Sequence, residues 1–467
     1  MRVTIKNYKS IREASIDLRP GLNILVGPNG SGKTCLLSAL QFLRDVFRVG
    51  AAQALALQGG ARRAYHHGQS QMSFSLTQDY GHRTYRRRKG PCQLHWQVSI
   101  AQAGPEKLAT VTEERLEVIS GGTRLFAVRV GRAAGAKARI GTRLARPEHF
   151  GRDLFSVWQA SRKGKAELGV DLKRMISSRL SRVKDEPDRS CVPMLGGLDD
   201  ALDEVITSFR FLSEYNILPD IARASTEKLP FAQMAPNGQA VSEVIDALEH
   251  QRFDKLEQLA LVEAGELYGL WDAYPPLYRY WGYHQHLVGP YRKRSRMTYH
   301  TALESINQEL AAAVRPITHV SVEIDPSNGK RFVVFKAERD TFYPQEVSDG
   351  TVKWLCILVS LFVPFSKVYL LEEPENFLHP WMQQRLISIM REQARQNKTI
   401  FLLASHSATV LNAALPEEIL IVRQGSQGTE VSTVGDADSI RQVLAASQFH
   451  LGDLWVSGAI GGVPTHE

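Results

Sequence analysis

The chain has 467 residues, a formal net charge of +8, 43% hydrophobic residues, 23% charged residues and four cysteines. This length is about three times that of a typical single domain, and the balanced composition excludes a wholly disordered chain, a collagen-like repeat and a small disulfide-stapled scaffold. The cysteines lie far apart without a Cys-x-x-Cys pair, so neither a disulfide framework nor a zinc site is predicted. The most apolar run, residues 354–365, falls short of the roughly 20 residues that a bilayer requires, and the N-terminus lacks the apolar core of a signal peptide. We therefore predict a cytoplasmic protein with no membrane partner.

Residues 1–134 are predicted to form a β-rich lobe with one early helix. Apolar and polar residues alternate in several short runs, which is the period of half-buried strands, whereas one stretch has apolar residues at helical spacing. The predicted strands span residues 3–8, 15–18, 22–27, 71–76, 92–100 and 124–130, and the predicted helix spans residues 33–47.

The rest of the chain changes pattern twice. Residues 135–315 have mainly helical periodicity and predict a helical insertion, whereas strands and helices alternate after Pro316 and predict an α/β lobe over residues 316–467. The fold class is therefore predicted to be α/β, in three domains. Helices are expected at residues 198–212, 240–262, 302–314, 351–363 and 380–396, and strands at 319–325, 331–337, 367–373, 399–405 and 418–423.

Positive charge is concentrated in one part of the chain. Residues 61–190 hold 26 Lys and Arg against 12 Asp and Glu, a net charge of +14, so the remaining sequence is acidic overall. This region indicates binding to DNA or RNA, or to an acidic partner protein; the alternative is a solvated basic face without a partner. Its clusters comprise Arg62, Arg63, Arg83, Arg86, Arg87, Arg88 and Lys89, followed by Arg129, Arg132, Lys137, Arg139, Arg143 and Arg146.

The strongest chemical signal is a phosphate-binding loop, GPNGSGKT at residues 27–34, between a predicted strand and a predicted helix. Its glycines let backbone N–H groups converge on phosphate oxygens, and the helix N-terminus adds partial positive charge. In such a loop Lys33 reaches the β- and γ-phosphates of ATP, and the Thr34 hydroxyl binds Mg²⁺. The ATP-binding residues are thus Gly27, Pro28, Asn29, Gly30, Ser31, Gly32, Lys33 and Thr34.

Two acids end a second apolar strand. Residues 368–371 run directly into Glu372 and Glu373, and burying such charges is unfavourable unless they face a cation or a reacting group. We assign Glu372 to Mg²⁺, through a water molecule, and Glu373 to the base that activates the attacking water. The alternative is that both glutamates simply begin an exposed loop.

The order of these motifs resembles a known family. GPNGSGKT, VSDGT at 347–351, VYLLEEPENFLHP at 368–380 and LLASHS at 402–407 resemble the ABC-type P-loop ATPase head of the RecF/SMC/OLD superfamily. More narrowly, they resemble the single-chain, AAA-type (OLD-like) ATPases of prokaryotic anti-phage defence systems. The resemblance implies a β-rich N-lobe and an α/β C-lobe interrupted by a helical insertion, and it implies an ATPase that acts as a dimer of heads.

The resemblance also implies roles for further residues. Ser348 and Gly350 would form the signature motif that caps the γ-phosphate held by the partner subunit, and His406 would sense that phosphate. Gln69 and Gln71 are the candidates for the lid-loop glutamine. The metal acid of this superfamily is usually aspartate, so Glu372 departs from the pattern by one methylene.

Three functional classes follow from the sequence. The first is an ATPase that senses or clamps nucleic acid, or holds a partner effector such as a nuclease, in anti-phage defence. The second is a DNA-repair or chromosome-structure ATPase, which the lack of sustained heptads over residues 61–340 disfavours. The third is the ATPase subunit of a membrane transporter, which the long separation of Lys33 from Ser348 disfavours. Asp436 and Asp438 form a D-x-D pair that we expect to be an exposed turn rather than part of a nuclease site.

Overall fold

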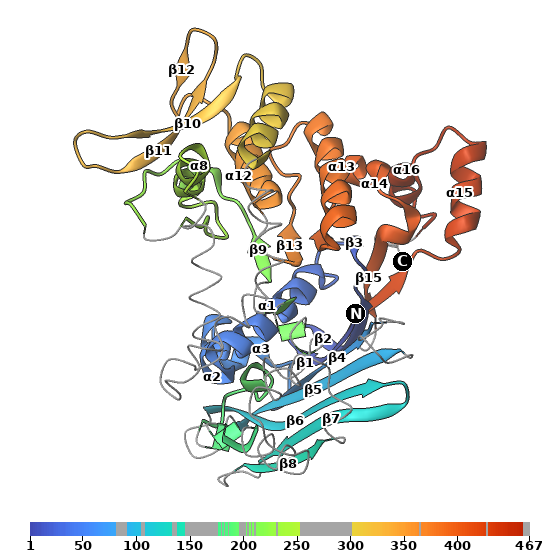
Figure 1. The fold of residues 1–467 in the computed structure, drawn as a ribbon. Coiled ribbons are helices and arrows are strands. Elements are labelled where there is room, and N and C mark those ends of the chain that lie inside the picture. The colour runs from blue at the N-terminus through green and yellow to red at the C-terminus, as the bar shows by residue number, and fades with distance from the viewer. Residues whose placement is uncertain are drawn as a thin grey trace. The chain divides into compact units, whose positions relative to one another are not determined.

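The computed structural model divides into two compact units (Figure 1). Unit 1 comprises residues 1–19, 27–212 and 421–432, and unit 2 comprises residues 20–26, 213–420 and 433–467. The predicted domain boundaries after residues 134 and 315 stay predictions. The structure describes residues 1–80, 91–103, 108–132, 138–144, parts of 176–209, 212–229, 232–252, 301–363, 366–425 and 428–460.

Unit 1 is built on a seven-stranded sheet in the order β2-β1-β4-β5-β6-β7-β8, with every neighbouring pair antiparallel. Burial alternates along β4, whose apolar Met72, Phe74 and Leu76 are buried while the intervening polar residues are partly exposed. One face of the sheet therefore belongs to the core. The strands are β1 (Arg2–Tyr8), β2 (Ile11–Asp17), β4 (Gln71–Asp79), β5 (Cys92–Ala103), β6 (Leu108–Ser120), β7 (Thr123–Gly131) and β8 (Arg139–Leu144).

Three helices of unit 1 follow one another along the chain: α1 (Lys33–Val49), α2 (Ala51–Leu57) and α3 (Ala61–Ala64) (Figure 1). The apolar stripe of α1 packs against the sheet, where Phe42 lies 5.5 Å from both Tyr8 and Phe74 between ring centroids. Farther along α1, Phe47 lies 5.0 Å from Trp96. These aromatic contacts explain why residues 33–47 have the helical spacing that predicted them.

Two strands of this sheet were not predicted. Strand β6 has Glu114 at a fully buried position, which breaks the alternation of apolar and polar residues. Its carboxylate accepts hydrogen bonds from Trp96 Nε1 (2.9 Å), Ser190 Oγ (2.6 Å) and the Cys191 amide (2.6 Å), so the sheet tolerates the charge. Strand β8 lies within the segment predicted to begin the helical insertion, and it instead pairs with β7.

Unit 2 contains a parallel sheet in which β3 (Gly21–Val26), β14 (Ile400–Ala404), β13 (Val368–Glu372) and β9 (Ser213–Tyr215) are neighbours. Apolar residues fill β13 and β14 almost continuously, as expected of strands buried on both faces. A second, antiparallel sheet contains β10 (His319–Ile324), β11 (Arg331–Lys336) and β12 (Thr341–Phe342). The α/β fold class is thus confirmed.

The helices of unit 2 include α12, which carries the most apolar run of the chain. Every residue from Gly350 to Leu361 is buried, so this run serves the core of the unit. Within the described ranges no helix has the length and apolar character needed to cross a membrane. The named helices are α7 (Pro219–Ala222), α8 (Val241–Glu249), α12 (Asp349–Phe362), α13 (Pro380–Asn397), α14 (Ala408–Ala413), α15 (Ala437–Ala446) and α16 (Leu451–Val456), and a further helix spans residues 301–313.

Helix α8 is shorter than the sequence predicted. It ends at Glu249, and Gln251 adopts a left-handed backbone conformation with φ 53°, which cannot continue a helix. The predicted helix over residues 240–262 is therefore wrong at residues 250–252, and its part after residue 252 lies outside the described residues. Residues 419–425 and 428–433 form the remaining strands, β15 (Ile419–Gly425) and β16 (Gly428–Thr433).

Candidate functional site

The loop at residues 27–34 lies in unit 1 and leads directly into α1. Gly32 is the N-cap of α1 with φ 105°, a conformation that glycine adopts without strain. A Cβ on Gly32 would lie 2.2 Å from Thr429 Oγ1, and a Cβ on Gly27 would lie 2.1 Å from the backbone oxygen of Val422. Neither position has room for a Cβ atom, so both require glycine.

Lys33 is folded back over the loop that contains it. It is buried, and its Nζ donates to the backbone oxygens of Gly27 (2.8 Å) and Pro28 (2.9 Å). Ser31 is also buried, and within the described part of the chain its Oγ has no hydrogen-bond partner. The first turn of α1 contains no acidic residue. A lysine, a hydroxyl and a helix N-terminus in one loop fit the phosphates of a nucleotide.

Other residues of the loop are exposed to solvent. Asn29 and Gly30 are exposed, and Thr34 is the exposed residue in the first turn of α1. A hydroxyl oxygen at this place suits Mg²⁺, which prefers oxygen ligands. The residues of the loop thus fit both ATP and Mg²⁺.

The predicted acids lie in unit 2, at the carboxyl edge of the parallel sheet. Glu372 is the last residue of β13 and pairs in register with Ala404, the last residue of β14. The amide of Glu373 donates to the oxygen of Ala404 (2.9 Å), and Glu373 has a positive φ of 44°. Because the strands are parallel, the residues that follow both of them meet at one edge of the sheet.

The structure brings Glu373 and His406 together at this edge. His406 Nε2 lies 3.8 Å from Glu373 Oε1, and Asn376 Nδ2 donates to Glu373 Oε2 at 2.7 Å. The side chains of Glu373 and His406 are 43% and 32% exposed, so a water molecule and a phosphate can reach both. A carboxylate held between an amide and an imidazole is suited to orient and activate a water.

Sequence reasoning missed Glu375, which supports this pair. Glu375 is buried, and its Oε1 accepts from Ser405 Oγ (2.5 Å) and from the His406 amide (3.1 Å). The other oxygen, Oε2, has no hydrogen-bond partner among the described residues. Glu375 therefore fixes the backbone that carries His406. The only sequence signal was a third acid in EEPEN, which the prediction treated as part of a loop.

The predicted signature residues also lie in unit 2, at the start of α12. Ser348 is the N-cap of this helix, and its Oγ accepts from the Thr351 amide at 3.2 Å. Ser348 and Asp349 are exposed, whereas Gly350 is buried, and a Cβ on Gly350 would lie 2.4 Å from the backbone oxygen of Phe377. The first turn of α12 thus packs against the loop that follows Glu373.

Lys353 is a second residue that the sequence did not reveal. It is buried one turn into α12, and its Nζ donates to the backbone oxygen of Glu373 (3.1 Å) and lies 5.6 Å from the centre of the Phe377 ring. Burial lowers the pKa of Lys353, while the carboxylates of Glu375 and Glu373 act in the opposite direction. The signature helix is therefore bonded directly to the backbone of the predicted catalytic glutamate.

The lid-loop candidates lie in unit 1. Gln69 is in the turn before β4 and its amide donates to the His66 oxygen (2.9 Å), while Gln71 is the first residue of β4. Both side chains are exposed. Their role in a lid stays a prediction.

The basic region needs one correction. Arg132 is buried, and its guanidinium donates to the backbone oxygens of Val111 (2.7 Å) and Val183, so it serves the fold rather than a polyanion. Arg129 is exposed, but it forms an ion pair with Glu113, which also pairs with Arg115. Arg139 and Arg143 are exposed on β8. Residues 83–89, Lys137 and Arg146 lie outside the described residues.

The D-x-D pair has a local role in the structure. Asp436 is the N-cap of α15, and its side chain accepts from the Asp438 amide (3.0 Å) and from Ser439 Oγ (2.6 Å). The hydroxyl and amide donors lower the pKa of Asp436. Among the residues that the structure describes, no group of three His, Cys, Asp or Glu side chains is placed to hold a metal ion.

Comparison with known proteins agrees with these motifs. A family model described as "AAA domain, putative AbiEii toxin, Type IV TA system" matches residues 281–412, and a model described as "AAA domain" matches residues 2–44. The chain is 50% identical over 42 residues to the DNA replication and repair protein RecF of Psychromonas ingrahamii, which covers 9% of this chain and 12% of that protein. It is 35% identical over 82 residues to RecF of Magnetococcus marinus, which covers 18% of this chain and 20% of that protein. These matches therefore span a small part of the relatives' length.

A solved structure is similar over most of the chain at low identity. It is described as "Crystal structure of the SmcHead bound to the C-winged helix domain of ScpA". The similarity covers 94% of this chain and 98% of that chain, with 11% sequence identity and a TM-score of 0.46.

Proposed function

We propose that the chain is an ABC-type ATPase of the RecF/SMC superfamily, which binds ATP with Mg²⁺ and hydrolyses it at composite sites that two copies complete for each other. The observation that carries the proposal is the pairing of Glu373 with His406 at the edge of the parallel sheet, beside the exposed start of the signature helix. The phosphate-binding loop supplies the nucleotide site.

Each residue has a distinct task in this proposal. Lys33 binds the β- and γ-phosphates, and Thr34 and Glu372 would hold Mg²⁺, which neutralises phosphate charge when bound. Glu373 accepts a proton from the attacking water, and His406 donates a hydrogen bond to the γ-phosphate. Ser348 and the backbone at Gly350 contact the γ-phosphate bound by the other subunit.

The biological role is proposed from the family description. We infer that nucleotide-dependent dimers act as a sensor or scaffold for a partner effector, of the nuclease class, in prokaryotic anti-phage defence. The support is the match to a model whose description names a toxin of a toxin–antitoxin system. The matches to RecF favour a second candidate, a DNA-repair or chromosome-structure ATPase. Strong stimulation of ATP hydrolysis by DNA alone would favour this second candidate.

Two substitutions test the catalytic assignment. Lys33→Ala should abolish ATP binding, whereas Glu373→Gln should retain binding, reduce kcat by about 10²- to 10⁴-fold and accumulate an ATP-bound dimer on sizing chromatography. The matched control is Glu338→Gln, which changes an exposed glutamate of unit 2 and should leave the rate unchanged. Hydrolysis by Glu373→Gln at the wild-type rate would refute the base assignment.

A further inference from the structure

Arg223 contacts the start of the signature motif and the loop that leads into it. Arg223 follows α7, and its side chain is only 14% exposed. Its Nε donates to the backbone oxygen of Pro344 (2.9 Å) and its Nη2 donates to that of Val347 (2.9 Å). Its Nη1 lies 2.6 Å from Asp349 Oδ1, within the motif itself.

These contacts use the geometry of a guanidinium. Three nitrogens in one plane reach three different points of residues 344–349, which a flexible ammonium group does not match. The remaining contact, from Nη1 to Asp220 Oδ1 (3.3 Å), is to an almost fully exposed side chain. The arginine is therefore directed at the loop before the signature motif.

The loop itself has few other constraints. Between β12 and α12 the chain forms turns, with a backbone hydrogen bond from Glu346 to Tyr343 (2.9 Å) and one from the Tyr343 amide to the Glu346 carboxylate (2.7 Å). Neither bond involves Val347, Ser348 or Asp349. The N-cap bond to Thr351 sets the start of α12 but not the path of the chain that leads to it. Arg223 supplies that constraint.

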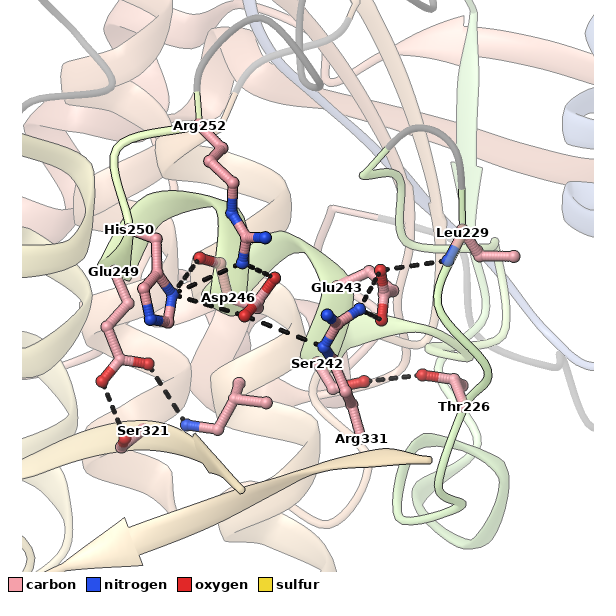
Figure 2. Close-up of polar contacts among 11 residues, drawn as sticks. Thr226, Leu229, Ser242, Glu243, Asp246, Glu249, His250, Arg252, Ser321 and Arg331 are labelled. Carbon is pink, nitrogen blue, oxygen red and sulfur yellow. Dashed lines mark hydrogen bonds and ion pairs between the residues drawn. The ribbon is translucent and has the colours of Figure 1, made fainter. Parts of the chain in front are cut away.

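The chain just after Arg223 joins a largely buried polar cluster (Figure 2). Thr226, three residues later, forms a two-way backbone bridge with Arg331 of β11 (2.8 Å each way), and its hydroxyl pairs with Ser242 Oγ on α8 (2.7 Å). The side chain of Arg331 donates to Glu243 at 3.0 Å and 3.2 Å.

The charged side chains at the centre of the cluster are paired and largely shielded from water. The Arg331 and Glu243 side chains are 8% and 2% exposed, and Asp246 lies beside both Arg331 and Arg252 (Figure 2). Breaking one member of such a cluster leaves a buried charge unpaired, which is costly, so the bridge between Thr226 and Arg331 ties this part of the chain to β11. Arg223 is therefore three residues from a point where the chain is bonded to β11 and α8.

We propose that Arg223 is a positioning residue for the signature motif, holding Ser348 and Gly350 in place for the γ-phosphate bound by the other subunit. This inference rests on the proposed composite ATPase site. Arg223 does not contact the nucleotide; it acts through residues 344–349. Its loss therefore impairs the site of the partner subunit and leaves the subunit's own phosphate-binding loop intact.

The test uses Arg223→Gln and the charge-retaining Arg223→Lys in the full chain. We expect ATP binding to be retained and kcat to fall by about 10- to 100-fold, since small displacements of positioned groups cost this much. The ATP-dependent dimer of the Glu373→Gln protein should weaken when Arg223→Gln is added. Arg395→Gln, on the exposed end of α13, is the matched control and should behave as wild type.

Subunit mixing separates a role in the partner's site from a general structural role. Arg223→Gln mixed with Lys33→Ala should regain about a quarter of the wild-type rate, because half of the randomly formed dimers are mixed and each has one intact site. Ser348→Arg mixed with Lys33→Ala serves as the reference and should regain a similar rate. If Arg223→Gln does not fold, Arg223→Lys takes its place in both experiments.

The outcomes distinguish this inference from the function on which it rests. Recovery with Ser348→Arg but not with the Arg223 variant overturns the positioning role and leaves the composite site standing. Recovery with neither variant refutes the composite site itself. Wild-type turnover by Arg223→Gln alone also overturns the positioning role.

Discussion

Replacing each of the three glycines of the phosphate-binding loop by alanine should destabilise the protein to a different degree. Gly30 has φ 80° and open space around it, so Gly30→Ala should cost only backbone strain of about 1–2 kcal/mol. At Gly32, with φ 105°, the new Cβ also meets the buried Thr429 side chain at 2.2 Å. Such overpacking adds about 1–3 kcal/mol, so Gly32→Ala should cost about 2–5 kcal/mol.

Gly27→Ala should be the most damaging of the three. The new Cβ would lie 2.1 Å from the Val422 backbone oxygen, which cannot rotate away as a side chain can. The strand that contains Val422, or the loop, must then move. Gly27→Ala should therefore lose both ATP binding and folding stability.

Urea unfolding and binding of a fluorescent ATP analogue measure this series. The expected order of stability is Gly30→Ala above Gly32→Ala above Gly27→Ala. Thr429→Ala removes the two atoms nearest to the new methyl group, so it should restore part of the stability of Gly32→Ala. If Gly27→Ala were as stable as Gly30→Ala, or Thr429→Ala gave Gly32→Ala no benefit, the steric reasoning would be refuted.

Two further predictions concern buried and exposed charges. Burial lowers the pKa of Lys353, so between that lowered pKa and the ordinary value of 10.5 the folded state binds fewer protons than the unfolded state. The free energy of unfolding should therefore rise with pH in that window. Lys353→Met should remove this rise in unfolding experiments at several pH values, and it should also reduce ATP turnover. Charge reversal at Arg139 and Arg143 should weaken DNA and RNA binding and flatten its dependence on salt without altering the ATPase rate, whereas unchanged binding would favour a basic face with no nucleic-acid partner.

The sequence predicted the parts of the site that are local in the chain. The phosphate-binding loop occupies eight consecutive residues, and the glycine conformations needed there follow directly from residue type. Glu373 was predicted because it follows an apolar strand, whereas His406 was predicted from the resemblance to the ATPase family; parallel pairing of β13 with β14 brings the two strand ends together. Their catalytic roles stay predictions.

The supporting residues were beyond sequence reasoning because their partners are distant in the chain. Arg223 and Val347 are 124 residues apart, and Lys353 and Glu373 are 20 apart. A basic residue carries no sign of whether it meets solvent, a phosphate or a backbone oxygen. Arg132 was assigned to a basic surface for this reason, although the backbone oxygen of Val111 binds it in the core.

The start of helix α12 faces solvent, whereas its inner side is bonded to the loop after β13. Its start presents Ser348 and Asp349 to solvent, where another subunit can reach them. Its inner side is bonded to the loop after β13, through Lys353 to the Glu373 backbone and through the close packing of Gly350 on Phe377. A displacement of Ser348 on binding the partner's γ-phosphate therefore has a direct path to Glu373 of the same subunit. Arg223, which bonds to Val347 and Asp349, acts at the start of this path.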